Sequence, residues 1–212
     1  MGHVYCSGPL FCPEELAGMS AIAGVLERAG YGTFLPQRDG LERYLLPYVD
    51  SALNTQRFGL RRRIDRAVFA LDVFQLAHRC EALVCNLNGR VPDEGAAVEA
   101  GIAFAVGTPV VLYKNDRRSV FHGADNSMLL GLSALAPVTS LEALPAALAR
   151  VSSPREKKAE RPLPPSLAAA IDEGAKLWRL LCLRGERPAE PPDDALAREL
   201  LAAIEASGPA QA

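Results

Sequence analysis

ALVCNL at residues 82–87 and PVVLY at residues 109–113 are apolar runs that contain no charged side chain. Between them lie a polar loop and the segment AAVEAGIAFAV, residues 96–106, whose only polar side chain is Glu99. Strands without a polar side are typical of parallel sheets covered on both faces, because no side of such a strand meets water. Strand, helix and strand in succession therefore predict an α/β fold with a parallel sheet.

The same alternation continues toward the N-terminus. Residues 4–6 begin a strand, Pro13 opens a helix that Gly30 ends, and residues 31–35 form a second strand. Proline suits the first turn of a helix because an N–H group at that position would have no partner within the helix. A further long helix is expected over residues 61–79. The pattern predicts a doubly wound parallel sheet.

Ligands of doubly wound sheets bind beyond the carboxyl ends of the strands. Three loops lie at those ends in the predicted fold, and they contain Gly8 with Pro9, Gln37 with Asp39, and Asp93. Their convergence predicts a ligand site at this edge of the sheet, and the prediction does not depend on any single motif.

The chain changes character after residue 138. A last core helix is expected over residues 141–151, and a proline-rich linker and two further helices complete the chain. We therefore expect an α/β domain over residues 1–151 and a C-terminal helical extension over residues 152–212. Two helices after such a linker are typical of an arm that docks on a partner or on a second copy.

Composition excludes several classes of protein. The 212 residues include 23 basic and 25 acidic side chains, so a net charge of −2 gives no general attraction to nucleic acid or to an anionic membrane. No apolar run reaches the roughly 18 residues that a membrane span needs. The N-terminus lacks the basic and apolar segments of a secretion signal, so we expect a cytoplasmic protein. The five scattered cysteines form no CxxC pair, and we expect neither a zinc site nor disulfides.

Glu99 is the candidate functional residue of the apolar segment. The segment shows no polar stripe, so we expect a buried helix, in which a carboxylate needs partners or has a raised pKa. Two interpretations are open: Glu99 pairs with an arginine such as Arg90, or it is a nucleophile or acid–base group. Asp93 alone would be a helix cap, whereas Asp93 and Glu99 together form the kind of carboxylate pair that performs glycosyl chemistry.

Other polar residues have simpler interpretations. Asp72 lies in a mostly apolar helix, where it either faces solvent at an edge or belongs to the site. Asn126 lies in a short polar sequence that is typical of a turn. Ser7 has neither the GxSxG pattern nor the acid and histidine context of a hydrolase triad. A phosphate-binding turn that begins at Ser7 is disfavoured, because Glu14 and Glu15 just beyond it would repel a phosphate.

Several short motifs occur together in the N-terminal two-thirds of the chain. They are YCSGPLF at residues 5–11, LVCNLNG at residues 83–89, DEG at residues 93–95, EAGIAFA at residues 99–105 and GADN at residues 123–126. Together these motifs resemble the nucleoside 2-deoxyribosyltransferases, and the DEG block is the most specific of them. Asn88 departs from the pattern, because the family often has aspartate there.

The resemblance implies a flavodoxin-like core and an enzyme that exchanges the base of a 2′-deoxynucleoside. Glu99 matches the nucleophile that attacks C1′ and holds the deoxyribosyl group, and Tyr5 matches the tyrosine that orients it. Asp72 and Asp93 match acids that contact the base and assist proton transfer to its nitrogen. Asn126 matches a residue that a neighbouring subunit donates to the sugar hydroxyl, which implies a homo-oligomer with shared active sites.

The resemblance also implies further substrate contacts and partners. The contacts are Gln37 and Asp39 at the base edge, together with Gly8, Pro9 and Gly95. The implied partners are a deoxynucleoside and a free nucleobase, with no cofactor and no metal. An N-glycosidic bond breaks through an oxocarbenium-like state that a carboxylate can trap, while an acid protonates the leaving nitrogen. A base then completes transfer and water completes hydrolysis. The alternatives are a nucleoside or nucleotide N-glycoside hydrolase and a non-catalytic nucleotide-binding module.

Overall fold

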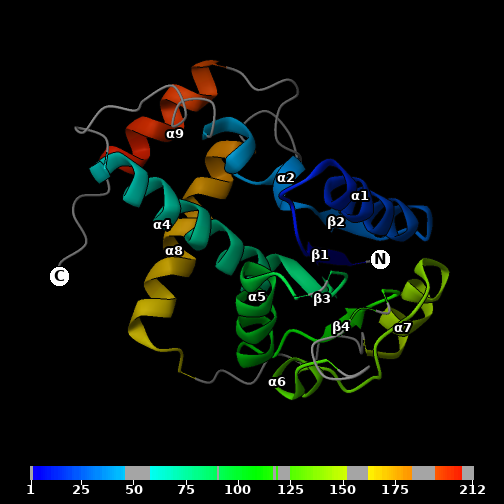
Figure 1. Ribbon diagram of the computed structural model, residues 1–212. Helices are drawn as coiled ribbons and strands as arrows, with labels where there is room; N and C mark the ends of the chain where they lie inside the picture. Colours follow the sequence, from blue (N-terminus) through cyan, green and yellow to red (C-terminus); the bar gives the residue numbers. More distant parts are fainter. Residues whose placement is uncertain are drawn as a thin grey trace. The chain divides into compact units, whose positions relative to one another are not determined.

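In the part of the chain that the computed structural model describes, four strands form an all-parallel sheet (Figure 1). The strand order is β2-β1-β3-β4, with β1 at His3–Ser7, β2 at Gly32–Phe34, β3 at Cys80–Asn86 and β4 at Val110–Tyr113. The structure describes residues 2–45, 58–89, 91–116, 118, 125–151, 162–182 and 194–206. The predicted α/β class and flavodoxin-like arrangement are confirmed.

The chain divides into two compact units. The first comprises Met1–Leu35 and Gln75–Pro162 and contains the sheet, whereas the second comprises Pro36–Phe74 and Leu163–Ala212. The helix predicted over residues 61–79 is shared between the units. Its first part is α4, Phe58–Phe74, and its end is a π-helical turn, η2, at Gln75–Arg79. Residues 36–74 therefore group with the C-terminal helices.

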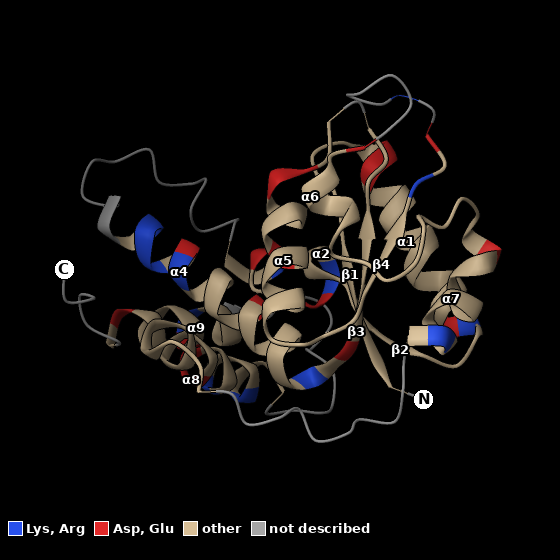
Figure 2. Ribbon diagram, turned by 90° about the horizontal axis from the view of Figure 1, so that it is seen from below, with Lys and Arg blue, Asp and Glu red and all other residues tan. Residues whose placement is uncertain are grey.

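Helices cover both faces of the sheet within the first unit. They are α1 (Pro13–Arg28), α5 (Glu94–Ala105), α6 (Ser127–Leu130), η3 (Leu141–Ala143) and α7 (Leu144–Val151). Figure 2 shows α1 and α7 on one side of the strands and α5 on the other. Val4 and Cys6 of β1 pack with Met19 of α1 in the hydrophobic core. Since successive side chains of a strand point to opposite faces, Tyr5 and Ser7 point toward α5.

The predicted start and end of α1 are confirmed. Pro13 occupies the first helical position, and Glu14 and Glu15 lie in the first turn, where their charges complement the helix dipole. Gly30 follows the helix with a φ of 90°, a left-handed conformation that glycine adopts without steric cost.

The expectation that the helix containing Glu99 is buried all round was wrong. Only Ala96, Ala100 and Ala103 are buried, and Val98 and Phe104 are each 57% exposed. The buried alanines are spaced as one face of a helix and pack against the sheet, so the larger apolar side chains lie outside that face. The missing polar stripe therefore marks an exposed apolar surface rather than complete burial.

The second unit is helical in the part that the structure describes. Its elements are α2 (Pro36–Asp39), α4, α8 (Pro165–Leu181) and α9 (Asp194–Ala206). A Cβ atom on Gly174 of α8 would clash with the Ala70 carbonyl of α4, so the glycine permits a close crossing. Arg63 of α4 donates to the Glu205 carbonyl oxygen at 2.9 Å. None of the helices described here is long and apolar enough to cross a membrane.

Candidate functional site

Two buried hydroxyl groups of β1 hold the carboxylate of Glu99. Tyr5 donates its hydroxyl to Oε1 of Glu99 at 2.7 Å, and Ser7 donates its hydroxyl to Oε2 at 2.5 Å. Tyr5 and Ser7 are both 0% exposed, whereas Glu99 is partly exposed. The Tyr5 ring in turn packs on Phe34, with ring centroids 5.2 Å apart. Hydrogen bonds to an ionised acceptor are the stronger class, so the carboxylate is held in one orientation at the carboxyl end of β1.

The sequence analysis considered Ser7 as a hydrolase nucleophile and as the start of a phosphate-binding turn, and it missed this contact. Ser7 and Tyr5 are separated by one residue in a strand, and such residues share a face. Once Tyr5 is assigned beside Glu99, the same parity assigns Ser7 there as well. The alternation along β1 was therefore the signal that identifies Ser7 as a site residue.

Asp93 is the N-cap of α5. Its Oδ1 atom accepts a hydrogen bond from the Ala96 backbone N–H at 2.7 Å. A capping aspartate satisfies a helix N–H group that has no partner within the helix. The helix-cap interpretation is thereby confirmed. The cap also fixes the start of α5, the helix that carries Glu99.

The charges of both carboxylates, Glu99 and Asp93, affect the pKa of Cys85 on β3. Burial is the main cause that raises the pKa of its thiol to about 12, and the negative charges of Glu99 and Asp93 raise it further, against a hydrogen bond with Ser7. Electrostatic influence of this kind falls with distance. The charges of both acids proposed from the sequence thus act on the same buried thiol.

Glycines near the site serve packing. A Cβ atom on Gly8, just after β1, would lie 2.5 Å from Sδ of Met19 on α1 and 2.8 Å from Cβ of Asn86 on β3, so a larger residue would require these groups to shift. A Cβ on Gly95 would lie 3.2 Å from Oδ1 of Asp93, the atom that caps α5. Their expected substrate contacts remain predictions. Arg90, the alternative partner of Glu99, lies outside the described residues.

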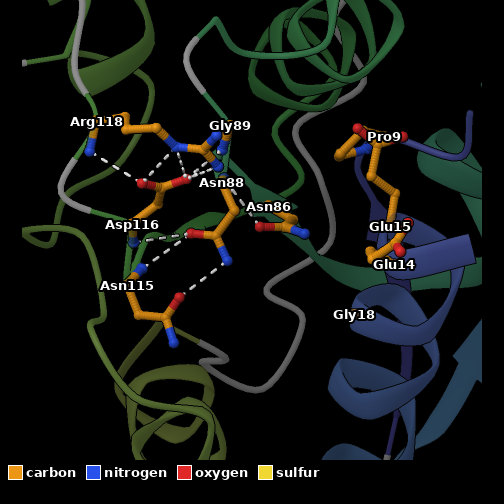
Figure 3. Close-up of a pocket in the computed structure, with 10 residues that line it drawn as sticks. All are labelled: Pro9, Glu14, Glu15, Gly18, Asn86, Asn88, Gly89, Asn115, Asp116 and Arg118. Carbon is orange, nitrogen blue, oxygen red and sulfur yellow. Dashed lines mark hydrogen bonds and ion pairs between the residues drawn. The ribbon is translucent and has the colours of Figure 1, made fainter. Parts of the chain in front are cut away.

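A polar pocket of about 480 Å³ opens at the same edge of the sheet, on the α1 side (Figure 3). One wall is the start of α1, with Pro9, Glu14 and Glu15. The facing wall consists of the loops that follow β3 and β4. The backbone N–H of Glu14 is the main cause that lowers the pKa of its carboxyl group, so this wall is anionic.

Asn88 builds the facing wall of this pocket. Its Nδ2 atom donates to Oδ1 of Asn115 at 3.0 Å, and its Oδ1 atom accepts from the backbone N–H groups of Asn115 and Asp116 at 3.0 and 3.2 Å. Arg118 is the main cause that holds the pKa of Asp116 far below its usual range. An amide at position 88 is both donor and acceptor, which a carboxylate is not. The departure from the family pattern thus ties the β3 loop to the β4 loop.

The remaining acids and amides expected at the site belong to the second unit. Asp72 lies on α4, and Gln37 and Asp39 lie on α2. Both carboxylate oxygens of Asp39 accept hydrogen bonds from Arg38, at 2.9 and 2.8 Å. Their contributions to the site therefore stay predictions. Within the described residues, no group of three or more His, Cys, Asp or Glu side chains is arranged to hold a metal ion.

Asn126 caps α6 and is exposed. Its Oδ1 atom accepts from the Met128 backbone N–H at 2.8 Å, so the predicted turn is confirmed. Asn126 and Met128 also line an apolar groove of about 460 Å³, together with Ala97 and Gly101 of α5. Met128 is 79% exposed. An exposed apolar groove thus adjoins the polar turn that contains Asn126.

A model of the nucleoside 2-deoxyribosyltransferase family matches residues 4–144. The chain belongs to this family. The match covers the whole of the region that carries Tyr5, Asp93, Glu99 and Asn126. Its members act on nucleosides and nucleobases, which agrees with an acid held at the carboxyl edge of a flavodoxin-like sheet.

Solved structures also match the chain, at low sequence identity. A conserved protein from Enterococcus faecalis V583 is 21% identical, with 71% of this chain and 98% of that chain covered and a TM-score of 0.45. A 2-deoxyribosyltransferase from Bacillus psychrosaccharolyticus is 19% identical, with coverage of 68% and 90% and a TM-score of 0.48. One from Leishmania mexicana is 16% identical, with 71% and 98% covered and a TM-score of 0.39. No curated protein matches the chain.

Proposed function

We propose that the protein transfers the 2-deoxyribosyl group between nucleobases through a covalent ester on Glu99. The observation that carries this proposal is the pair of hydroxyl groups, Tyr5 and Ser7, that hold both oxygens of the Glu99 carboxylate. A nucleophile fixed in one orientation loses little entropy on the way to the transition state. Partial exposure of Glu99 leaves room for a sugar to approach it.

In the first step, a carboxylate oxygen of Glu99 attacks C1′ of the deoxynucleoside. The C1′–N bond breaks, its electron pair stays on the base nitrogen, and an acid supplies the proton that neutralises the leaving base. Asp93 is the acid that lies on the same unit as Glu99, and its Oδ1 already caps α5. Asp72, Gln37 and Asp39 follow the family pattern as contacts of the base.

In the second step, a nitrogen of the incoming base attacks C1′ of the ester. The C1′–O bond breaks, the electron pair returns to Glu99, and the proton of the attacking nitrogen passes to the acid that was deprotonated in the first step. Tyr5 and Ser7 act here by donating to the carboxylate as its charge returns. No group other than these side chains is needed to balance atoms and charge.

The substrate that we propose is a nucleoside rather than a nucleotide. Phosphates bind at helix N-termini where backbone N–H groups are free and the dipole is unopposed. At the start of α1, Glu15 already accepts the Phe11 N–H at 2.8 Å, and Glu14 adds a second negative charge. A phosphate group that entered the polar pocket would meet repulsion at this wall.

The active unit that we propose is a homo-oligomer in which Asn126 reaches the sugar of a neighbouring subunit. Oδ1 of Asn126 is engaged in the cap of α6, which leaves its Nδ2 group to donate to a hydroxyl. The adjoining groove and the exposed Val98 and Phe104 of α5 supply apolar surface that a second copy would cover.

The test incubates the protein with deoxyinosine and free cytosine and identifies the products. Transfer predicts deoxycytidine and hypoxanthine without free deoxyribose. Glu99→Ala is expected to abolish exchange while the far-ultraviolet circular dichroism spectrum is unchanged. Exchange by that variant at more than a few per cent of the wild-type rate would contradict the nucleophilic role. Deoxyinosine 5′-monophosphate in place of deoxyinosine tests the nucleoside preference.

Hydrolysis is the second candidate, favoured by the partial exposure of Glu99, which admits water. It predicts free deoxyribose and hypoxanthine in the same assay, whether or not cytosine is present. A non-catalytic binding module predicts binding without either product, and its binding would be unchanged in Glu99→Gln.

A further inference from the structure

A buried ion pair stands directly beside Asn126. Nζ of Lys114 lies 2.5 Å from Oδ1 of Asp125, and the two side chains are only 8% and 9% exposed. Lys114 follows the end of β4, and its backbone N–H donates to the Val138 carbonyl at 2.8 Å. Asp125 precedes Asn126, the N-cap of α6. The pair thus ties the capped turn to the sheet across eleven positions of the chain.

Stability alone does not account for such a pair. Two charges that leave water lose hydration, and apolar side chains of similar size commonly give equal or greater stability in the same place. Loss of one partner is different, because it leaves the other charge buried and uncompensated. A buried pair therefore constrains position strongly even where it adds little to the free energy of folding.

We infer that Lys114 is a positioning residue, which acts through Asp125 to hold Asn126 where a neighbouring subunit's sugar can meet it. Among the described residues of this segment, the side chains of Asp125 and Leu129 are buried against their own subunit, whereas Met128, two residues beyond Asn126, is 79% exposed. The inference rests on the proposed sharing of sites between subunits.

Three variants separate position from stability. Lys114→Met leaves Asp125 buried without its partner, and we expect it to lower kcat/KM by about ten- to a hundredfold, as a displaced contact does. Lys114→Arg keeps the charge and is expected to recover most of the activity. The double variant Lys114→Met with Asp125→Leu removes both charges. Its Tm is expected to lie within a few degrees of the wild-type Tm, whereas its kcat/KM is expected to stay below that of the wild type. Lys176→Met, which changes an exposed lysine of α8, is the matched control.

Mixed oligomers distinguish a misplaced contact from a general loss of structure, because only the first is expected to recover activity when two inactive variants are combined. Glu99→Ala subunits lack the nucleophile but keep an intact turn, whereas subunits of the double variant keep the nucleophile and lack the anchored turn. The two proteins are unfolded and refolded together in equal amounts. Half of the sites then contain Glu99, and half of those face an intact turn, so about a quarter of wild-type activity is expected from random assembly.

Each outcome of these experiments supports or overturns the proposed role of Lys114. Wild-type kcat/KM in the folded double variant overturns the inference, as does a loss that mixing fails to recover while an Asn126→Ala loss is recovered. If neither loss is recovered by mixing, the shared site itself fails, and the role of Lys114 fails with it. An absence of turnover in the wild-type protein points instead to failure of the proposed activity.

Discussion

Replacing Ser7 by alanine tests the geometry around Glu99 most directly. Ser7→Ala removes the hydroxyl that donates to Oε2 and leaves Tyr5 bonded to Oε1. Ser7 is 0% exposed, so the lost donor is not replaced by bulk water. The change deletes a single oxygen atom and leaves the strand backbone in place.

The two chemical steps respond differently to this loss. Glu99 loses negative charge as it bonds to C1′, so a hydrogen bond to it is weaker in the first transition state than in the free enzyme. In the second step the carboxylate departs and regains charge, so the donor stabilises that transition state. A hydrogen bond to a charged group contributes about 1.5–3 kcal/mol. With part of the charge developed, we expect the second step to slow by about tenfold, at 1.4 kcal/mol per factor of ten.

The assay combines exchange kinetics with intact-protein mass spectrometry of the quenched reaction. Ser7→Ala is expected to lower kcat for exchange and to increase the fraction of protein that carries a deoxyribosyl adduct. Tyr5→Phe should act in the same direction. Ser20→Ala, which removes an exposed hydroxyl bonded to the Leu16 carbonyl, is the matched control. A kcat within twofold of the wild type, with no added adduct, would show that the Ser7 hydrogen bond has no part in the reaction.

Three further predictions concern other residues. Asn88→Asp removes the donor to Asn115 and places a carboxylate beside Asp116, so the free energy of unfolding should fall by about 1 kcal/mol in urea denaturation. Burial raises the pKa of the Glu42 carboxyl group above its value of 4.5 in the unfolded chain, so this group destabilises the fold at any pH above 4.5. Glu42→Gln should therefore raise Tm at pH 7 and leave Tm unchanged near pH 4. The raised pKa of Cys85, about 12, keeps its thiol protonated, so iodoacetamide at pH 8 should leave it unmodified in native protein, as peptide mass spectrometry would show.

Local sequence patterns determined the class of fold and much of the site. Apolar runs at β3 and β4 report burial on both faces, and that property belongs to each strand separately. The sequence predicted the contact of Tyr5 with Glu99 from motifs that resemble a family, and the cap at Asp93 from helix chemistry; both signals are local. Cap residues act within one turn of the helix that they begin.

Only the tertiary structure decided which surfaces and side chains meet. Ser7 contacts Glu99 across 92 positions of the chain, and Lys114, which follows the edge strand β4, contacts Asp125. The apolar sequence of α5 indicates that the helix has apolar surface, but it does not indicate whether residues of the same chain cover that surface. Such contacts depend on strand order and helix packing, which many residues distant in sequence determine together. No periodic pattern within a single segment therefore predicts them.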